Sequence, residues 1–191
     1  IDEEYFLMAI AADLMFVAER RGLLNDPVLR DIQVLTRLVF DQYGHLNEDG
    51  RWLMQPGVLR DHKDYKFAGN QRLAPALSPK IVDNIGIDSS HSHRFPLWLE
   101  SFRRGSQGED AVFYAAISRA FAAQFGHTVL TPAGTAFPWP ALKNYMSGDN
   151  GVYRYGYHTL GQQLGYGPYQ LSYALLHGWY GFMGSKPLGA E

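Results

Sequence analysis

Residues 5–44 read YFLMAIAADLMFVAERRGLLNDPVLRDIQVLTRLVFDQYG and specify two consecutive helices. The first, Tyr5 to Arg21, carries apolar residues on almost every side, which predicts a largely buried helix. Gly22 is the expected C-cap, and Asp26-Pro27 is an N-cap followed by proline, a pattern that starts a helix. The stretch therefore predicts an αα-hairpin with a short connection. Apolar residues recur at helical spacing in its second helix, which runs to Gly44: Val28, Ile32, Leu35 and Val39.

Further helices are expected on the C-terminal side of this hairpin. Ser106 to Glu109 matches a capping box, which would start the second of them. The connections are rich in aromatic, glycine and proline residues, above all over 131–140 and 145–167. The helical patterns cover three ranges, which are 96–104, 111–125 and 169–182.

The middle of the chain is less regular. Trp52-Leu53-Met54 follows a turn signal and fits a short strand, and the charged segment Asp61 to Arg72 predicts a surface loop. We expect residues 1–191 to form a single helical domain, either a whole protein or part of a longer chain. Its fold class is mainly α, with helical hairpins packed as an α/α array or partial toroid and long aromatic-rich loops.

Composition excludes several classes of function. With 17 basic and 19 acidic residues the net charge is -2, so no basic surplus drives binding to nucleic acid. The absence of cysteine excludes disulfides, cysteine-ligated zinc and thiol nucleophiles. No apolar stretch reaches the roughly 18 to 20 residues of a membrane span. The chain starts at Ile1, which fits a mature protein after signal removal or a piece of a longer one; we expect a periplasmic or secreted location.

The segment Asp88-Ser89-Ser90-His91-Ser92-His93-Arg94 is dense in groups that bind or transfer protons. A neutral histidine can act as a general base near neutral pH, because the ordinary imidazole pKa is about 6.5. We expect His91 to be that base, with Asp88 orienting its ring. Arg94 can bind a substrate carboxylate in a two-pronged geometry, with Ser90 beside it. The alternative for Arg94 is an ion pair on a helix surface.

The same segment also fits a metal site. His91 and His93 have a common ligand spacing, because alternate residues of an extended segment point the same way. Asp88 could add an oxygen ligand, and the ion would be a divalent transition metal. In the structural alternative, one histidine braces the following helix and the other is solvated.

A second cluster follows about sixty residues later, in DNGVYRYGYH, residues 149–158. Three alternating tyrosines would project to one side of an extended backbone, and a tyrosine can donate a proton or, if nearby cations lower its pKa, accept one. The alternative is a tyrosine-rich packing strand. The cluster supplies two candidate catalytic tyrosines and three candidate substrate-binding residues: Tyr153 and Tyr155, and Arg154, Tyr157 and His158.

This layout resembles that of the alginate-lyase-type polysaccharide lyases. The resemblance covers His91 with its neighbours and the tyrosine-rich segment; Ser89 and Ser90 stand where that family has asparagines. It implies an α/α-toroid fold and β-elimination. Arg94 and Ser90 would then partly neutralise a uronate carboxylate, His91 or a tyrosine would remove the neighbouring proton, and Tyr155 would protonate the leaving oxygen.

We therefore expect a carbohydrate-active enzyme without a cofactor, acting on an acidic oligo- or polysaccharide. A glycoside hydrolase would instead need two carboxylates, for which Asp88 and Asp149 are the natural pair. Two other classes stay open: a metal-binding protein and a non-catalytic helical interaction domain. The motifs of serine hydrolases, P-loop nucleotidases, dinucleotide-binding enzymes and His-Glu-x-x-His metalloproteases are absent from the sequence.

Overall fold

Two antiparallel helices begin the chain, as the sequence predicts. A computed structural model describes residues 2–23, 26–157 and 164–183. Helix α1 spans Asp2–Arg20 and α2 spans Pro27–Tyr43. The Asp26 carboxylate accepts hydrogen bonds from the amides of Val28 (2.9 Å) and Leu29 (3.4 Å), so the predicted N-cap is confirmed. Gly22 has φ +68°, the left-handed conformation expected just after a helix.

The prediction that the first helix is largely buried is wrong. Helix α1 buries one face, which includes Tyr5, Ala9 and Ala12. Helices α2 and α4 cover that face, and the opposite apolar face is largely exposed. The exposed apolar residues of α1 lie at a spacing of three and four: Phe6, Leu7, Ile10, Leu14 and Val17.

The second helical pair packs against the first. Helix α4 spans Phe95–Gly105 and α5 spans Gly108–Gln124, followed by a π-helical turn, Phe125–Val129. A Cβ on Gly105 would lie 2.2 Å from the carbonyl oxygen of Ala12, so only glycine permits this close approach of α4 to α1. The predicted capping box is wrong, because Gln107 is the N-cap of α5 and makes no side-chain capping bond.

The remaining elements are short. Strand β1, Gly44–Leu46, pairs with β2, Trp52–Met54, and β3, Leu130–Thr131, pairs with β4, Ala141–Leu142; both pairs are antiparallel. The predicted strand at Trp52 is therefore confirmed. Helix α3 is a single turn, Ser89–Ser92.

The predicted helix over 169–182 is interrupted. It consists of a 3-10 helix, Gln170–Leu176, and a short α6, Tyr180–Met183. Between them, Gly178 lies against the carbonyl of His93, where a Cβ would be 1.8 Å from the oxygen. This tertiary contact overrides the local helical pattern.

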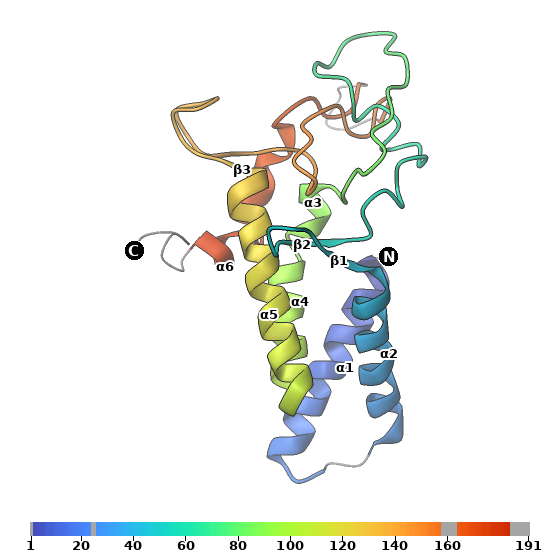
Figure 1. Ribbon diagram of the computed structural model, residues 1–191, viewed down its shortest axis with the longest axis vertical. Coiled ribbons are helices and arrows are strands. Elements are labelled where there is room, and N and C mark those ends of the chain that lie inside the picture. Colours follow the sequence, from blue (N-terminus) through green and yellow to red (C-terminus); the bar gives the residue numbers. More distant parts are fainter. Residues whose placement is uncertain (1, 24–25, 158–163, 184–191) are drawn as a thin grey trace.

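The mainly helical class is confirmed, and the molecule has an elongated helical body with a region of long loops at one end (Figure 1). The body encloses an aromatic-rich core built from α1, α2, α4 and α5. A second, smaller core lies in the loop region and contains Tyr65, Tyr145 and Tyr153. No helix of the described residues is long and apolar enough to cross a membrane.

Phe40 lies at the centre of the body core. Its ring is 2% exposed and packs on four other buried aromatic rings with centroids 5.4 to 5.8 Å away, those of Tyr5, Trp52, Phe102 and Tyr114. We expect Phe40→Ala to lower the free energy of unfolding by about 3–5 kcal/mol, because it leaves a cavity. Urea denaturation measures this. Leu38→Ala on the same helix is the matched control, since Leu38 is 54% exposed and should change stability by less than about 0.5 kcal/mol.

Candidate active site

Helix α3 begins at a buried carboxylate. Asp88 is 1% exposed and caps the turn, accepting from the amides of Ser90 (3.1 Å) and His91 (3.0 Å). The turn is held in the loop region by its main chain: the Ser89 amide donates to the Asn144 carbonyl at 2.8 Å, and the Trp179 indole donates to the Ser89 carbonyl at 2.9 Å. The turn is therefore anchored by segments distant in the sequence.

Three side chains converge on the Asp88 carboxylate. His91 Nδ1 lies 2.8 Å from both oxygens, the Tyr65 hydroxyl donates to Oδ2 at 2.9 Å, and the Ser90 hydroxyl donates to Oδ1 at 2.5 Å. Burial by itself would raise the pKa of Asp88. The hydrogen bond and charge of His91, together with the hydrogen bonds from Ser90 and Tyr65, hold that pKa below its usual range. Asp88 is therefore ionised, and it fixes the proton of His91 on Nδ1.

His91 and residues of the second cluster line one cavity. Its volume is about 160 Å³, and it lies where α3 meets the loop region. The Tyr153 hydroxyl is 3.5 Å from His91 Nδ1, and the Arg154 guanidinium pairs with Asp64 at 2.9 Å. The cavity thus combines an imidazole, a phenol and a guanidinium. Its lining residues are Leu59, His62, Asp64, Tyr65, Ile87, Asp88, His91, Tyr153 and Arg154.

The Tyr153 phenol holds its proton. Burial is the main cause that raises its pKa above the ordinary range, and the negative charge of Asp88 adds to it. Arg154 acts in the opposite direction, but more weakly. Nearby cations therefore do not produce the lowered pKa that a tyrosine base would need, and the chemistry of Tyr153 is that of a proton donor.

The tyrosines of the second cluster do not share one side. Arg154 has φ +50°, so the backbone is not extended and the three rings diverge. The Tyr155 hydroxyl accepts from the Leu77 amide at 3.0 Å and donates to the Ala74 carbonyl at 3.3 Å, outside the cavity lining. Tyr157 is 50% exposed, with its ring 5.1 Å from the Arg154 guanidinium. The predicted binding residue His158 lies outside the described residues.

Two predicted binding residues also lie elsewhere than expected. The Arg94 guanidinium sits 5.4 Å above the ring of Phe6 on α1 and does not line the cavity. The hydroxyl of Ser90 is engaged with Asp88, so this serine supports the carboxylate that orients His91. Of the predicted site residues, the structure brings together Asp88, His91, Tyr153 and Arg154, with Ser90 behind Asp88.

The geometric basis for the histidine pair as metal ligands is wrong. His91 lies in the helical turn α3 and His93 just after it, so the two rings diverge. His93 Nδ1 bonds the carbonyl of Ser90, and its ring lies 5.3 Å from that of His177. Among the described residues, no three acidic or histidine side chains are grouped as a metal would need.

Sequence reasoning missed the part of the site contributed by residues 61–72. The sequence predicts a charged surface loop there, but Tyr65 is only 5% exposed and its hydroxyl reaches Asp88. Asp64 comes from the same segment and binds Arg154. No spacing rule connects this segment with His91; the one sequence signal is Tyr65 within the otherwise polar stretch 61–66.

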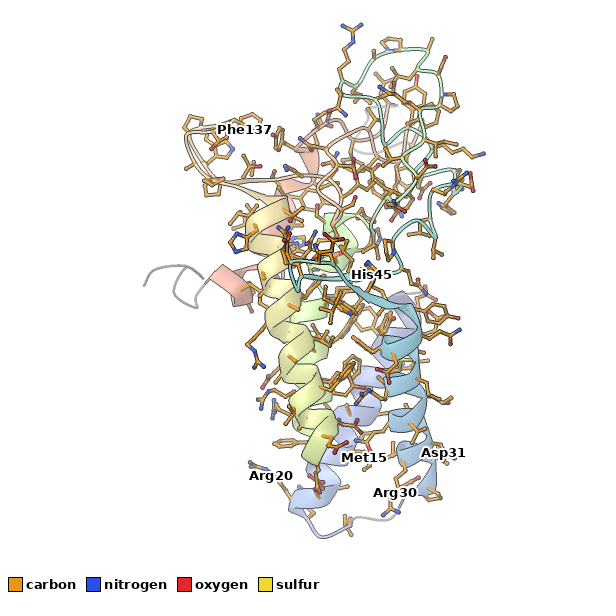
Figure 2. The ribbon with its side chains drawn as sticks, viewed as in Figure 1. Met15, Arg20, Arg30, Asp31, His45 and Phe137 are labelled. Atoms are coloured by element: carbon orange, nitrogen blue, oxygen red, sulfur yellow. The ribbon has the colours of Figure 1, made fainter. Side chains whose placement is uncertain are left out.

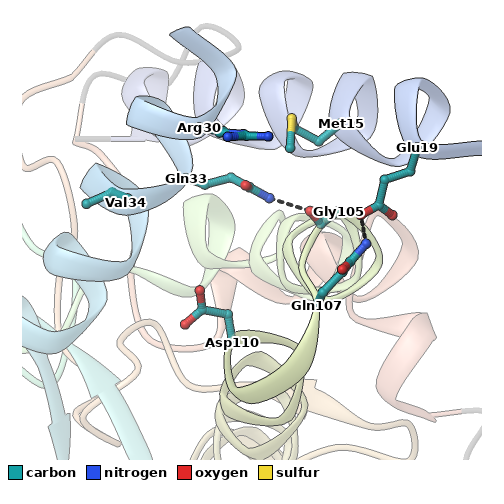
Figure 3. Close-up of a pocket in the computed structure, with 8 residues that line it drawn as sticks. All are labelled: Met15, Glu19, Arg30, Gln33, Val34, Gly105, Gln107 and Asp110. Atoms are coloured by element: carbon teal, nitrogen blue, oxygen red, sulfur yellow. Dashed lines mark hydrogen bonds between the residues drawn. The ribbon is translucent and has the colours of Figure 1, made fainter. Parts of the chain in front are cut away.

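A larger cavity of about 520 Å³ lies at the far end of the helical body, among α1, α2, α4 and α5 (Figure 3). Its polar groups are engaged with one another: Gln33 donates to the Gly105 carbonyl, and Gln107 donates to Glu19. Asp110 accepts from Arg37 at 2.6 Å. The contacting acid and base pair needed for proton transfer lies in the other cavity, beside α3.

Comparison with protein-family models, curated proteins and solved structures finds no match to this chain.

Asp88→Asn should make the stability of the protein less dependent on pH. A depressed folded-state pKa contributes stability that is fully present above the unfolded pKa, about 3.9, and is lost as pH falls through the folded value. We expect the variant to be less stable by about 1–3 kcal/mol near neutral pH, with a difference that shrinks as the pH falls below the unfolded-state pKa. Urea denaturation across this range measures it.

Asp83→Asn is the matched control, because the Asp83 side chain is 80% exposed and only pairs with Arg60. This variant should change the free energy of unfolding by less than about 0.5 kcal/mol across the same pH range. An equal loss for both variants would contradict the assigned role of Asp88.

Proposed function

We propose that this protein is a carbohydrate-active enzyme, a polysaccharide lyase that cleaves an acidic glycan by β-elimination. One observation carries the proposal: a buried Asp88 orients His91 in a cavity that Tyr153 and Arg154 also line. The site thus contains a base, a proton donor and a cation, which are the groups that this reaction uses. The resemblance to alginate-lyase-type enzymes agrees with this set.

His91 is the proposed base. The ionised carboxylate of Asp88 only accepts hydrogen bonds, so a neutral His91 ring carries its proton on Nδ1 and its basic lone pair on Nε2. That nitrogen would take the proton from the carbon next to the uronate carboxylate. The electron pair of the broken C–H bond then forms a double bond to the adjacent carbon.

Tyr153 is the proposed acid. As the double bond forms, the bond from the adjacent carbon to the glycosidic oxygen breaks, and that oxygen takes the phenolic proton. A phenol whose pKa is raised by burial stays protonated until then. The cycle closes when His91 loses and Tyr153 regains one proton, so that no water, oxidant or reductant is consumed.

Arg154 is the proposed partner of the uronate carboxylate. Neutralising that carboxylate acidifies the neighbouring C–H and stabilises the enolate-like transition state. The guanidinium is held by Asp64 through Nε, and its side chain is 29% exposed. Arg154 thus takes the place of Arg94, which the resemblance to alginate-lyase-type enzymes suggested as the partner of the uronate carboxylate.

The cavity favours a lyase over a hydrolase. A hydrolase would use two carboxylates that face the scissile bond. Both oxygens of Asp88 are occupied by protein donors, and Asp149 does not line the cavity but accepts from the Ser147 hydroxyl at 2.6 Å. The predicted pair is therefore not available as an acid and a base.

Two broader predictions belong to the same proposal. The helical pairs α1–α2 and α4–α5 would be consecutive units of an α/α array or partial toroid, the arrangement of the lyases that the sequence resembles. A polysaccharide substrate fits a periplasmic or secreted location.

His91→Ala and Tyr153→Phe should each lower turnover of an acidic polysaccharide by roughly 10²–10⁴-fold, because each removes one proton-transfer group. The ultraviolet absorbance of the unsaturated uronate product measures the rate. Tyr155→Phe is the matched control for Tyr153→Phe: its hydroxyl is held by Leu77 and Ala74, so it should retain turnover. Full activity of His91→Ala with an intact fold would overturn the proposal.

Arg154→Gln should raise KM for an acidic polysaccharide by roughly tenfold or more, because one charge-assisted contact to the carboxylate is lost. Arg94→Gln is the control and should leave KM unchanged, since Arg94 does not line the cavity. Steady-state kinetics on both variants separates the two arginines. A rise in KM confined to the Arg94 variant would restore the role predicted from the sequence.

A further inference from the structure

A hairpin of aromatic residues projects from the loop region. The strands β3 and β4 are joined by residues 132–140, and Figure 2 places Phe137 in this connection, at the opposite end of the molecule from Met15 and Arg30. The turn is closed by a hydrogen bond of 2.7 Å from the Gly134 amide to the Phe137 carbonyl. Prolines at 132, 138 and 140 fix φ along the hairpin, so its shape is largely preset.

Two rings of this hairpin stack with nearly parallel planes. The planes of Phe137 and Trp139 differ by 9°, with ring centroids 5.8 Å apart. Trp139 is 60% exposed, whereas Phe137 is partly buried. The ring of Tyr169 supports Phe137 from the side, at 5.5 Å and an interplanar angle of 88°. An exposed tryptophan is thus held in one orientation by the rings beside it.

The hairpin that carries Phe137 and Trp139 is itself uncharged. Residues 131–142 contain no Asp, Glu, Lys, Arg or His, and the exposed side chains beside the rings are small, such as Ala133, Thr135 and Ala136. A stable protein partner would bury about 20–30 residues on each side, and a nucleic acid would require nearby cations. The short uncharged hairpin over 131–142 offers neither. The C–H face of a sugar ring requires a flat, exposed aromatic surface with hydroxyl partners at its edge. Thr135 and the hairpin carbonyls supply such partners.

We propose that Phe137, Trp139 and Tyr169 form a glycan-binding surface on which a pyranose ring of a polysaccharide stacks. The expectation that this polysaccharide is acidic rests on the proposed function. The stacking of a sugar ring on these aromatic rings does not depend on that function. The surface shares its framework with the catalytic turn, because the Asn150 side chain accepts from the amides of Tyr169 (2.9 Å) and Asn144 (3.2 Å). The Asn144 carbonyl in turn accepts from Ser89.

The test measures binding without turnover. His91→Ala protein is run in native gels that contain alginate, polygalacturonate or hydroxyethyl cellulose, and retardation gives the affinity. We expect retardation by an acidic polysaccharide, and adding Trp139→Ala should weaken it by roughly tenfold. Tyr180→Ala is the matched control, because Tyr180 is also a 60% exposed aromatic residue but lies on α6. It should leave the affinity unchanged.

Tryptophan fluorescence gives a second readout. Trp52, Trp98 and Trp179 are at most 4% exposed, so acrylamide quenching reports mainly on Trp139. Bound polysaccharide should protect this residue from quenching.

Each outcome is decisive for the surface. The absence of retardation in all three gels, or equal retardation of the Trp139→Ala and parent proteins, overturns the proposal. Quenching protection by oligothymidylate but by no polysaccharide also overturns it. Retardation that depends on Trp139, combined with no turnover of acidic glycans by the wild-type protein, supports the surface while rejecting the proposed lyase activity.

Discussion

A single buried carboxylate organises the loop region of this protein. Removing an ionised group from water costs several kcal/mol unless hydrogen bonds replace its hydration. Asp88 meets this requirement with the amides of its own helical turn and with the side chains of Ser90, His91 and Tyr65. The turn, the loop that carries Tyr65 and the second core must therefore fold together. A site built this way is rigid before any ligand arrives.

Local signals in the sequence predicted the helical body well. Asp26-Pro27 starts α2 because the Asp26 carboxylate caps amides of the first turn and Pro27 occupies its first position. The end of α1 at Gly22 also depends only on neighbouring residues. The burial of α1 was predicted wrongly, because helical periodicity cannot say how many neighbours a helix has. The break at Gly178 was missed for a related reason: it depends on the carbonyl of His93, which is distant in the sequence.

The candidate site likewise combines contacts that the local sequence predicts with contacts that depend on distant residues. Asp88 and His91 are three residues apart, so their contact follows from one helical turn and could be proposed from the sequence. Tyr65 could not, since it lies 23 positions before Asp88, across an irregular segment. The sequence could not show which tyrosine lines the cavity, because a positive φ at Arg154 has no signature in its residue type. Glycine or asparagine at this position would have indicated it.

Asp88 also explains how one cavity can hold both a base and an acid. Its carboxylate bonds to His91 Nδ1, so Nε2 is the ring nitrogen that would exchange a proton with a substrate. The negative charge of Asp88, acting on a buried phenol, raises the pKa of Tyr153 and keeps it protonated. Arg154 opposes this effect only weakly. Burial acts to lower the pKa of Arg154, but its pairing with Asp64 and the charge of Asp88 act to raise it. In the proposed reaction, one carboxylate thus sets the two proton-transfer groups to opposite roles, as elimination across a glycosidic bond would require.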